Sequence, residues 1–560
     1  MKSLIHSRFR LGVVAALLYL CIASPAEAKV KLPALISDSM VLQREQPVKV
    51  WGTADAGENV QVKFPKKGIP TAYKGEKLKS SYSATADANG NWSITLPPLK
   101  AGGPFTLQVN DIELKDILVG DVWLCSGQSN MELPVGRVTD MFRDEIAAYN
   151  NDKIRHIIVP KVYNFHAPQQ DTPPANWKAL TQENVLNFSA LAYFFAKAYY
   201  EKTGVPVGLI NASWGGTPVE AWISEEGLKE FPKYINAKRQ YEDDAYCEHL
   251  KKTEGESSYR WNTALYRGDA GLHEATPWYA TNYDDSNWQS VDLLSAEWNN
   301  NGLNPINGSH WFRKSLSIPA SMASQKATLR LGCIVDADSV YVNGKFVGTT
   351  GYQYPPRIYT IPEGLLKAGN NNITIRLISN GGYAHFVKEK PYKIICNNEE
   401  ISLEGEWKYR LGAPMPNAPG STFFCYKPVC LYNAMIAPLK NCALKGVIWY
   451  QGESNVSQRN EYAALLTTLI SDWRTTFHNA ELPFYIVELA DFLSKDDIYG
   501  RKSWAEMRRE QAKAAQMNKN ALLIKNSDLG EWNDIHPLDK KTLGERIAQS
   551  ALQATDLKSK

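Results

Sequence analysis

The sequence has few cysteines for its length, and none of them stands in a metal-binding motif. Eight cysteines occur in 560 residues, and Cys21 falls within an N-terminal apolar stretch. Neither a CxxC pair nor a cluster of cysteine with histidine has the spacing of a structural zinc site, so we expect no metal and no cofactor. Cys425 and Cys430 are close enough in sequence to bridge in an oxidising compartment, but the sequence alone does not establish that pairing.

The sequence also lacks a strong excess of charge and a long internal apolar run. It carries 62 basic and 59 acidic residues, which gives a net charge of +3. Since no basic run stands out, we expect no nucleic-acid partner. Beyond residue 28 no stretch reaches the roughly 20 apolar residues that a membrane-spanning helix needs. We therefore expect no membrane span.

Residues 1–28 have the pattern of a secretory signal peptide. A basic start precedes an apolar stretch at 11–22, and Ala26-Glu27-Ala28 fits a small-x-small cleavage site. An uncleaved anchor is the alternative, but the apolar stretch is shorter than the roughly 20 residues that span a bilayer. We predict cleavage near Ala28 and a secreted or periplasmic mature protein.

The length and the changing residue patterns predict several domains. At about 100–200 residues per domain, three or four are expected. Residues 30–115 alternate apolar and polar side chains, which is typical of a small β-sandwich of immunoglobulin type. Residues 116–245 and 413–553 alternate strands and helices, whereas 255–412 return to strand patterns and Asn/Gly turns at jelly-roll spacing. We therefore predict a discontinuous α/β domain with a β-sandwich in front and a jelly roll inserted.

The most informative turn follows an apolar strand pattern at 117–125. It reads Gly127-Gln128-Ser129-Asn130, and its small residues allow a tight turn. Open α/β sheets place their functional sites at the carboxyl ends of such strands, so Ser129 is a candidate nucleophile. The alternative is an ordinary loop in which Ser129 or Asn130 caps the next helix.

A serine nucleophile needs a base, and His536 is the candidate. Among the nine histidines, His536 alone lies in a short polar loop after a strand-rich segment, with Asp534 two positions earlier. Asp534 could orient the imidazole, although Asn533 could compete for that role. The alternatives are that His536 is a surface residue capping the last helix and that Asp534 is that helix's N-cap.

Two further turns after predicted strands could supply donors for an oxyanion. Candidate donors are the backbone N–H of Ser129, a backbone N–H at Gly215 or Gly216, and the side-chain amide of Gln451. Glu453, close by, could contact substrate, support the histidine or hold its loop together. Together these turns raise Ser129 from a loop residue to a site residue.

Four strings in this order resemble the sialate O-acetylesterase family of SGNH-type carbohydrate esterases. They are GQSNM at 127–131, SWGGTPVEAW at 213–222, WYQGESN at 449–455 and DIHP at 534–537. The resemblance spans nearly the whole chain after the leader. It implies a three-layer SGNH-hydrolase-like α/β domain, with the following site residues: Ser129 as nucleophile, His536 as base, Asp534 as acid, Ser129, Gly215 and Gln451 as oxyanion hole, and Asn130 and Glu453 as possible substrate contacts or supports.

One position departs from the general SGNH pattern. That pattern places an aspartate three residues before the histidine, and here the position is Asn533. The acid is therefore Asp534 or comes from elsewhere, or the site is a Ser–His dyad with backbone support.

The resemblance implies a serine esterase that removes O-acetyl groups from carbohydrates through an acetyl-enzyme on Ser129. We favour O-acetylated sialic acids as substrates. One alternative is an esterase for acetylxylan or another polysaccharide, and another is a non-catalytic glycan-binding protein that uses the insert. The sequence leaves open the oligomeric state and whether the insert binds glycan.

Overall fold

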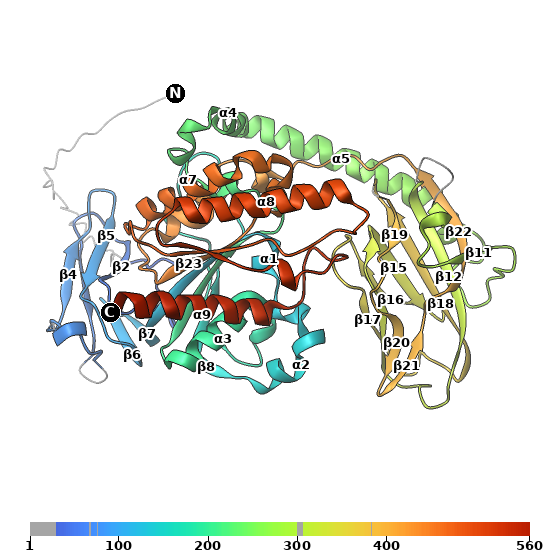
Figure 1. Cartoon of the computed structure of the whole chain (residues 1–560), viewed down its shortest axis with the longest axis horizontal. Helices are drawn as coiled ribbons and strands as arrows, with labels where there is room; N and C mark the ends of the chain where they lie inside the picture. The colour runs from blue at the N-terminus through green and yellow to red at the C-terminus, as the bar shows by residue number, and fades with distance from the viewer. Residues whose placement is uncertain (1–29, 66–68, 76, 300–305, 382, 560) are drawn as a thin grey trace, which may run out of the picture.

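The computed structural model describes most of the chain. The described ranges are 30–65, 69–75, 77–299, 306–381 and 383–559, so the predicted signal peptide at 1–28 lies outside them. Figure 1 shows a β region near the N-terminus, a central α/β region and a second β region at the opposite end. Within these ranges, no helix combines the length and hydrophobicity needed to cross a membrane.

The central region contains a mostly parallel sheet. Its strand order is β25 (Ala521–Ile524), β24 (Phe484–Val487), β23 (Gly446–Tyr450), β7 (Ile112–Gly127), β10 (Val207–Ser213), β8 (Asn151–Ile158) and β9 (Lys178–Leu180). All neighbours pair in parallel except β9, which runs antiparallel to β8. Every residue of β10 and β23 is buried, as expected for parallel strands covered on both faces.

Helices cover both faces of this sheet. In Figure 1, α3 (Ala190–Thr203) and α9 (Lys540–Ser559) lie on one side, and α7 (Tyr462–Thr476) and α8 (Ile498–Met517) on the other. The burial of α7 follows the helical period, because Leu465, Leu469 and Trp473 are fully buried. The predicted mixed α/β fold is therefore confirmed.

The N-terminal β region is continuous with the central sheet through β7. The first part of β7 pairs with β1 (Val41–Gln43) and β6 (Gly102–Val109), and its last part pairs with β10 and β23. The remaining strands form the pairs β2 (Val48–Thr53) with β5 (Asn91–Leu96) and β3 (Asn59–Lys63) with β4 (Tyr82–Thr85). Apolar side chains of this region belong to the same buried cluster as those of the central sheet.

A long helix, α5 (Asp244–Gly268), replaces the β structure predicted to begin at 255. Asp243 caps this helix by accepting the Tyr246 N–H at 3.1 Å, and Lys251 pairs with Glu248 one turn away at 2.7 Å. In Figure 1 the helix runs from the central region to the second β region. The predicted boundary therefore falls inside a helix that links the two regions.

The second β region is an insertion between the two halves of the α/β region. Its six-stranded sheet has the order β11 (Gln289–Asp292), β22 (Glu406–Met415), β12 (Asn307–Ile318), β18 (Gly369–Ser379), β15 (Ala337–Val342) and β16 (Lys345–Thr350). Its four-stranded sheet has the order β17 (Ile358–Ile361), β13 (Ala327–Leu331), β20 (Tyr392–Cys396) and β21 (Glu399–Ser402), and β14 (Ile334–Val335) pairs with β19 (His385–Phe386). These strands enclose a separate hydrophobic cluster that includes Phe312 and Trp407.

The cysteines of the described chain are free thiols, including the suggested pair Cys425 and Cys430. The Cys430 thiol donates instead to the carbonyls of Lys427 at 3.0 Å and Phe424 at 3.5 Å. Burial raises the pKa of the Cys425 thiol to about 11. Both cysteines therefore serve as buried packing residues in this structure.

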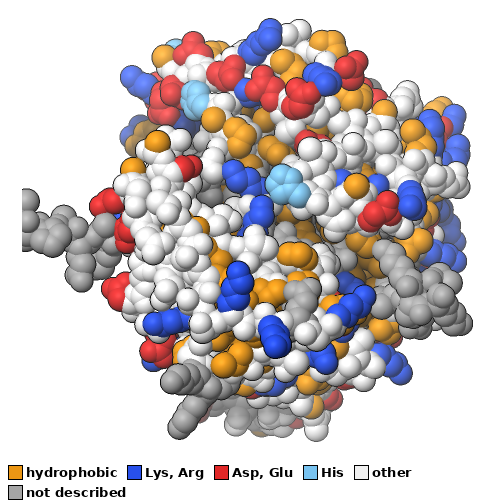
Figure 2. All heavy atoms as spheres, turned by 90° about the vertical axis from the view of Figure 1, so that its left-hand side faces the viewer, with side chains coloured by type: hydrophobic (Ala, Val, Ile, Leu, Met, Phe, Trp, Pro, Cys, Tyr) orange, Lys and Arg blue, Asp and Glu red, His pale blue; other side chains and the backbone are white. Residues whose placement is uncertain are grey.

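Figure 2 views the molecule from the side that carries the N-terminal β region. Acidic side chains gather mainly along the upper edge of this face, and basic side chains are spread over its upper and lower parts. The face therefore carries both signs of charge, in keeping with the net charge of +3.

Candidate active site

The turn that presents Ser129 depends on a glycine at the end of β7. Gly127 has φ +134°, and a Cβ there would lie 2.1 Å from the Tyr450 carbonyl oxygen. The short helix α1 (Ser129–Glu132) begins directly after Gln128, whose N–H donates to that same carbonyl at 3.0 Å. Gln128 is the N-cap residue, so neither Ser129 nor Asn130 has the capping role considered from the sequence.

The structure brings Ser129 and His536 together across 407 residues of chain. The Oγ atom of Ser129 lies 2.9 Å from Nε2 of His536. His536 is 7% exposed, and the ring of Tyr354, from the insertion, meets its imidazole edge-on at 5.3 Å. This is the separation at which a serine hydroxyl can pass its proton to an imidazole.

The surroundings keep the His536 imidazole neutral. Burial lowers its pKa to about 3, and the positive charges of Lys540 and Arg137 act in the same direction. A neutral imidazole has one unprotonated ring nitrogen, which can accept the Ser129 proton. In the resting site, the imidazole is therefore unprotonated at the nitrogen that would accept the proton.

Asp534 lies beside His536 but does not hydrogen-bond its ring. Its Oδ1 accepts the backbone N–H of His536 at 2.8 Å and is 3.9 Å from Nδ1 of the imidazole. Nδ1 has no hydrogen-bond partner among the described residues. Asn533, the competing candidate, instead donates its amide to the Lys388 carbonyl at 2.8 Å. Asp534 is therefore placed near the imidazole, one short movement from contact.

Gly215 reaches the neighbourhood of the nucleophile, and its N–H is engaged. A Cβ on Gly215 would lie 3.3 Å from Cβ of Ser129. Its N–H donates to Oε2 of Glu132 at 2.7 Å, and the other oxygen of Glu132 pairs with Lys161. The N–H of Ser129 has no acceptor within the described part of the chain. A substrate oxygen that used both N–H groups would have to displace the Glu132 carboxylate from one of them.

The Gln451 amide, the third predicted oxyanion donor, already has hydrogen-bond acceptors in this structure. Gln451 is fully buried, and its Nε2 donates to Oδ1 of Asn455 at 2.7 Å and to the Thr217 carbonyl at 3.2 Å. Its Oε1 accepts the Tyr462 hydroxyl at 2.8 Å. All hydrogen-bonding groups of this side chain are thus used to join two loops. A substrate oxygen could accept from the Gln451 amide only if one of these acceptors were displaced.

A buried polar cluster lies directly behind the Ser129–His536 pair. Asn130 donates to Oε1 of Glu453 at 2.7 Å and to the Ile535 carbonyl at 2.9 Å, and it accepts from Nζ of Lys540 at 2.7 Å. Burial raises the pKa of Glu453. Burial lowers the pKa of Lys540 to about 8, although the negative charge of Glu453 acts in the opposite direction. Asn130 and Glu453 therefore support the histidine loop.

Lys540 is a member of this cluster that the sequence analysis missed. It is 1% exposed, although it stands at the start of a helix where lysine is usually solvated. Lys540 is the first residue of α9 and follows the histidine loop directly, and that position is the signal that could have indicated it. Among the described residues, no group of three or more His, Cys, Asp or Glu side chains could hold a metal ion.

The fold and the site together define a class. A mostly parallel sheet with helices on both faces presents a Ser–His pair at the carboxyl ends of its strands, an arrangement typical of α/β hydrolytic enzymes. The sequence model of the family "Carbohydrate esterase, sialic acid-specific acetylesterase" matches residues 119–259 and 415–553. The chain belongs to this family and is a carboxylic ester hydrolase.

Known proteins agree with this placement. The chain is 23% identical to the sialate O-acetylesterase of Rattus norvegicus over 96% of its own length and 75% of the relative's. It is 33% identical to the human sialate O-acetylesterase over 35% of this chain and 39% of the relative. A carbohydrate acetylesterase from Xanthomonas citri aligns with a TM-score of 0.53 and 24% identity, covering 93% of this chain and 74% of that structure. This last match shows a shared fold.

Buried histidines should make the protein less stable in acid. Burial lowers the pKa of His536 to about 3, of His156 to about 3 and of His310 to about 4. An unfolded histidine titrates near pH 6.5, so between pH 6.5 and about 4 the unfolded chain binds more protons than the folded one. The free energy of unfolding should then fall by about 1.4 kcal/mol per pH unit for each histidine as the pH is lowered.

Urea unfolding at pH 7 and pH 5 would measure this dependence. His156→Phe offers a matched comparison, because the His156 ring already stacks on Phe188 at 4.3 Å and its Nε2 has no partner among the described residues. The variant should lose a third of the histidine-dependent change. An unaltered pH dependence in this variant would contradict the assignment of His156 as a buried neutral group.

Proposed function

We propose that this chain is a serine esterase that removes O-acetyl groups from carbohydrates, with O-acetylated sialic acids as the favoured substrates. The single observation that carries the chemistry is the 2.9 Å separation between Ser129 Oγ and His536 Nε2. The substrate class rests on the family description and on the names of the relatives. A purely glycan-binding role is disfavoured, because such a role does not require a buried Ser–His contact.

The reaction would proceed in two steps. Ser129 Oγ attacks the acetyl carbonyl carbon while its proton passes to His536 Nε2, and the C–O bond to the sugar then breaks as the sugar oxygen takes that proton. A water molecule next attacks the acetyl-enzyme, giving its proton to His536, and Ser129 recovers the proton as acetate leaves. The N–H groups of Ser129 and Gly215 would stabilise the oxyanion, each contributing roughly 3–4 kcal/mol.

Asp534 is the proposed acid of the site. When the imidazole becomes positively charged, its Nδ1–H needs an acceptor, and Oδ1 of Asp534 is 3.9 Å away. Since N–H···O hydrogen bonds span about 2.7–3.2 Å, an approach of about 1 Å would complete the contact. The proposed catalytic set is therefore Ser129, His536 and Asp534, with Glu132 leaving the Gly215 N–H as substrate enters.

We place the sugar in a hollow between the insertion and the histidine loop. This hollow has a volume of about 500 Å³, and its lining includes Tyr354, Tyr383, Trp532 and Asp534. The three aromatic side chains are 39–47% exposed, so their faces are open to a ligand. Tyr354 also touches the His536 ring, which puts the hollow next to the reacting atoms. Aromatic side chains with a few polar groups are typical of such binding sites.

The remaining sequence predictions complete the proposal. Residues 1–28 would direct export and be removed near Ala28, which would deliver the enzyme outside the cytoplasm. Residues 30–115 would form an immunoglobulin-like sandwich, and the insertion within 255–412 a jelly roll that contributes to sugar binding.

Acetate release from three acetylated compounds would test the function. The parent protein should release acetate from acetylated sialic acid, from acetylated xylo-oligosaccharides more slowly, and from a simple aryl acetate. Acid quenching followed by mass spectrometry should find the acetyl group on the peptide that contains Ser129. A preference for xylo-oligosaccharides would instead assign the enzyme to polysaccharides, and no release from any compound would contradict the esterase proposal.

A further inference from the structure

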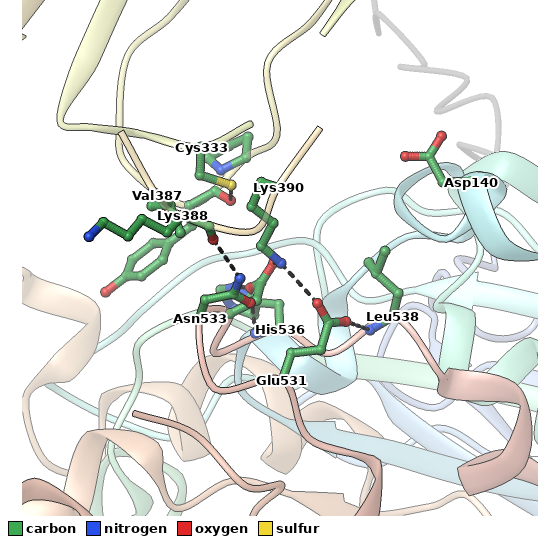
Figure 3. Close-up of polar contacts among 12 residues, drawn as sticks. Asp140, Cys333, Val387, Lys388, Lys390, Glu531, Asn533, His536 and Leu538 are labelled. Atoms are coloured by element: carbon green, nitrogen blue, oxygen red, sulfur yellow. Dashed lines mark hydrogen bonds and ion pairs between the residues drawn. The ribbon is translucent and has the colours of Figure 1, made fainter. Parts of the chain in front are cut away.

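A short segment of the insertion contacts the loop that carries His536. The segment 388–390 lies between β19 and β20, and it contacts residues 531–534 one after another. The Lys388 carbonyl accepts from Asn533 at 2.8 Å, and Glu389 Oε2 accepts the Trp532 indole N–H at 2.8 Å. In Figure 3, dashed lines join the Lys388 backbone carbonyl to Asn533 and the Lys390 side chain to Glu531. Backbone and side-chain contacts thus join the two parts of the molecule at the histidine loop.

Lys390 is the most buried charged group that the insertion contributes to this contact. Its side chain is 12% exposed, and its Nζ lies 2.8 Å from Oε2 of Glu531 and 3.3 Å from Oδ2 of Asp534. The other oxygen of Glu531 accepts the Leu538 N–H at 3.0 Å. Lys390 therefore pairs with two acids that precede His536 in the loop, and one of them, Glu531, also accepts from the backbone beyond His536.

The two oxygens of Asp534 have separate tasks in this arrangement. Oδ2 faces Lys390, and Oδ1 faces the His536 backbone N–H and ring. Asp534 is 9% exposed, so water contributes little to fixing its orientation. Burial lowers the pKa of Lys390, but the charges of Asp534 and Glu531 outweigh it, so the pKa is raised. The ammonium group is therefore present at neutral pH and can pair with the Asp534 carboxylate.

We propose that Lys390 is a positioning residue that turns the Asp534 carboxylate toward the His536 imidazole, so that the insertion completes the esterase site. This inference rests on the proposed function. With Lys390 in place, Asp534 is anchored by one oxygen, and the other remains available to accept Nδ1–H when the imidazole is protonated. Without Lys390, the Asp534 carboxylate loses the cation that fixes its Oδ2. The positive charges of Lys540 and Arg137, which act on His536, would remain.

Lys390→Met in the full-length protein tests this inference. Steady-state kinetics with an aryl acetate, which needs no sugar contacts, should show that kcat is lowered by about 10²-fold. Displacing a catalytic group by about 1 Å has an effect of that size. KM should change little. Lys390→Arg, which keeps the charge, should restore most of kcat. A merely structural role would change the melting temperature without this division between kcat and KM.

Lys393→Met is the matched control. Lys393 lies three residues further along on β20 and pairs with Glu400 at 2.6 Å on the surface of the insertion. This variant should retain the parent kcat. If Lys390→Met has the same kcat as Lys393→Met while the parent is active, the positioning role is overturned and the esterase proposal stands.

Two further outcomes are distinguishable. If the parent releases no acetate and Ser129 is never acetylated, the proposed function itself fails, and the inference fails with it. If Lys390→Met does not fold, Lys390→Gln is the second variant, since it keeps an N–H donor for Asp534 but loses the charge. Its kcat should be lower than that of the parent and of Lys390→Arg, but higher than that of Ser129→Ala. A kcat equal to that of the parent would overturn the positioning role.

Discussion

Ser129→Ala should abolish acetate release, with a loss in kcat on the order of 10³-fold or more. The reason is chemical, because the variant has no oxygen to form the acetyl-enzyme and leaves His536 without its proton donor. The fold should be unaffected, since Ser129 is half-buried and its hydroxyl contacts the His536 ring. Acetate release from an aryl acetate and from acetylated sialic acid, together with the melting temperature, would measure the two effects separately.

Ser126→Ala provides the control for this experiment. Ser126 lies three residues earlier on β7 and is fully buried, and its hydroxyl donates to the Ala212 carbonyl at 2.5 Å. Its replacement should alter stability slightly and leave the rate of acetate release near that of the parent. Parental activity in Ser129→Ala would show that another group is the nucleophile.

Asn130→Leu should give the largest loss of stability among the single changes considered. Leucine has nearly the same shape as asparagine, but it would leave the Lys540 ammonium, the Glu453 carboxyl group and the Ile535 carbonyl without their present partner. A buried polar group without a partner costs about 1–3 kcal/mol, and more if charged. We therefore expect a decrease of about 3–6 kcal/mol in the free energy of unfolding.

Chemical unfolding with urea would measure this decrease. Asn518→Leu is the comparison, because Asn518 makes two side-chain hydrogen bonds, to Thr467 Oγ1 at 3.0 Å and the Ala514 carbonyl at 2.8 Å, far from the histidine loop. An equal decrease in the free energy of unfolding in the two variants would show that the Asn130 cluster contributes no more than an ordinary pair of hydrogen bonds. Any Asn130→Leu protein that remains folded should also be poorly active, because the Ile535 contact helps to hold His536.

Hydrophobic patterns in the sequence predicted individual strands well. The apolar run at 446–450 is strand β23 with the same bounds, and the run at 521–524 is β25. Both are parallel strands, and β23 is buried throughout, which makes continuous hydrophobicity a strong signal, whereas β25 at the sheet edge is buried only at Ile524. The boundary at 255 was wrong, because α5 continues to Gly268, with Arg260 and Glu256 paired one turn apart at 3.9 Å beyond it.

The candidate site was predictable where the chemistry follows a strand end. Ser129 and His536 lie 2.9 Å apart, since Ser129 begins α1 directly after the turn that ends β7 and His536 lies in a loop that reaches it. The direction of the Gln451 amide was not predictable, because it depends on the carbonyl of Thr217, 234 residues away, as well as on nearby Asn455. Lys390 lay beyond reach for a similar reason, as its partner Asp534 is 144 residues away in the chain.

The continuity of β7 limits how this protein can be divided. One strand of 16 residues begins among the N-terminal strands and ends at the turn that holds Ser129. There is thus no linker at which a hinge, a proteolytic cut or a truncation could separate the N-terminal strands and leave the nucleophile turn intact. A shortened protein beginning after residue 111 would expose the edges of β7 that β1 and β6 cover. Evolution could exchange the insertion by altering its contacts at the histidine loop, whereas the N-terminal strands and the nucleophile must be inherited as one piece.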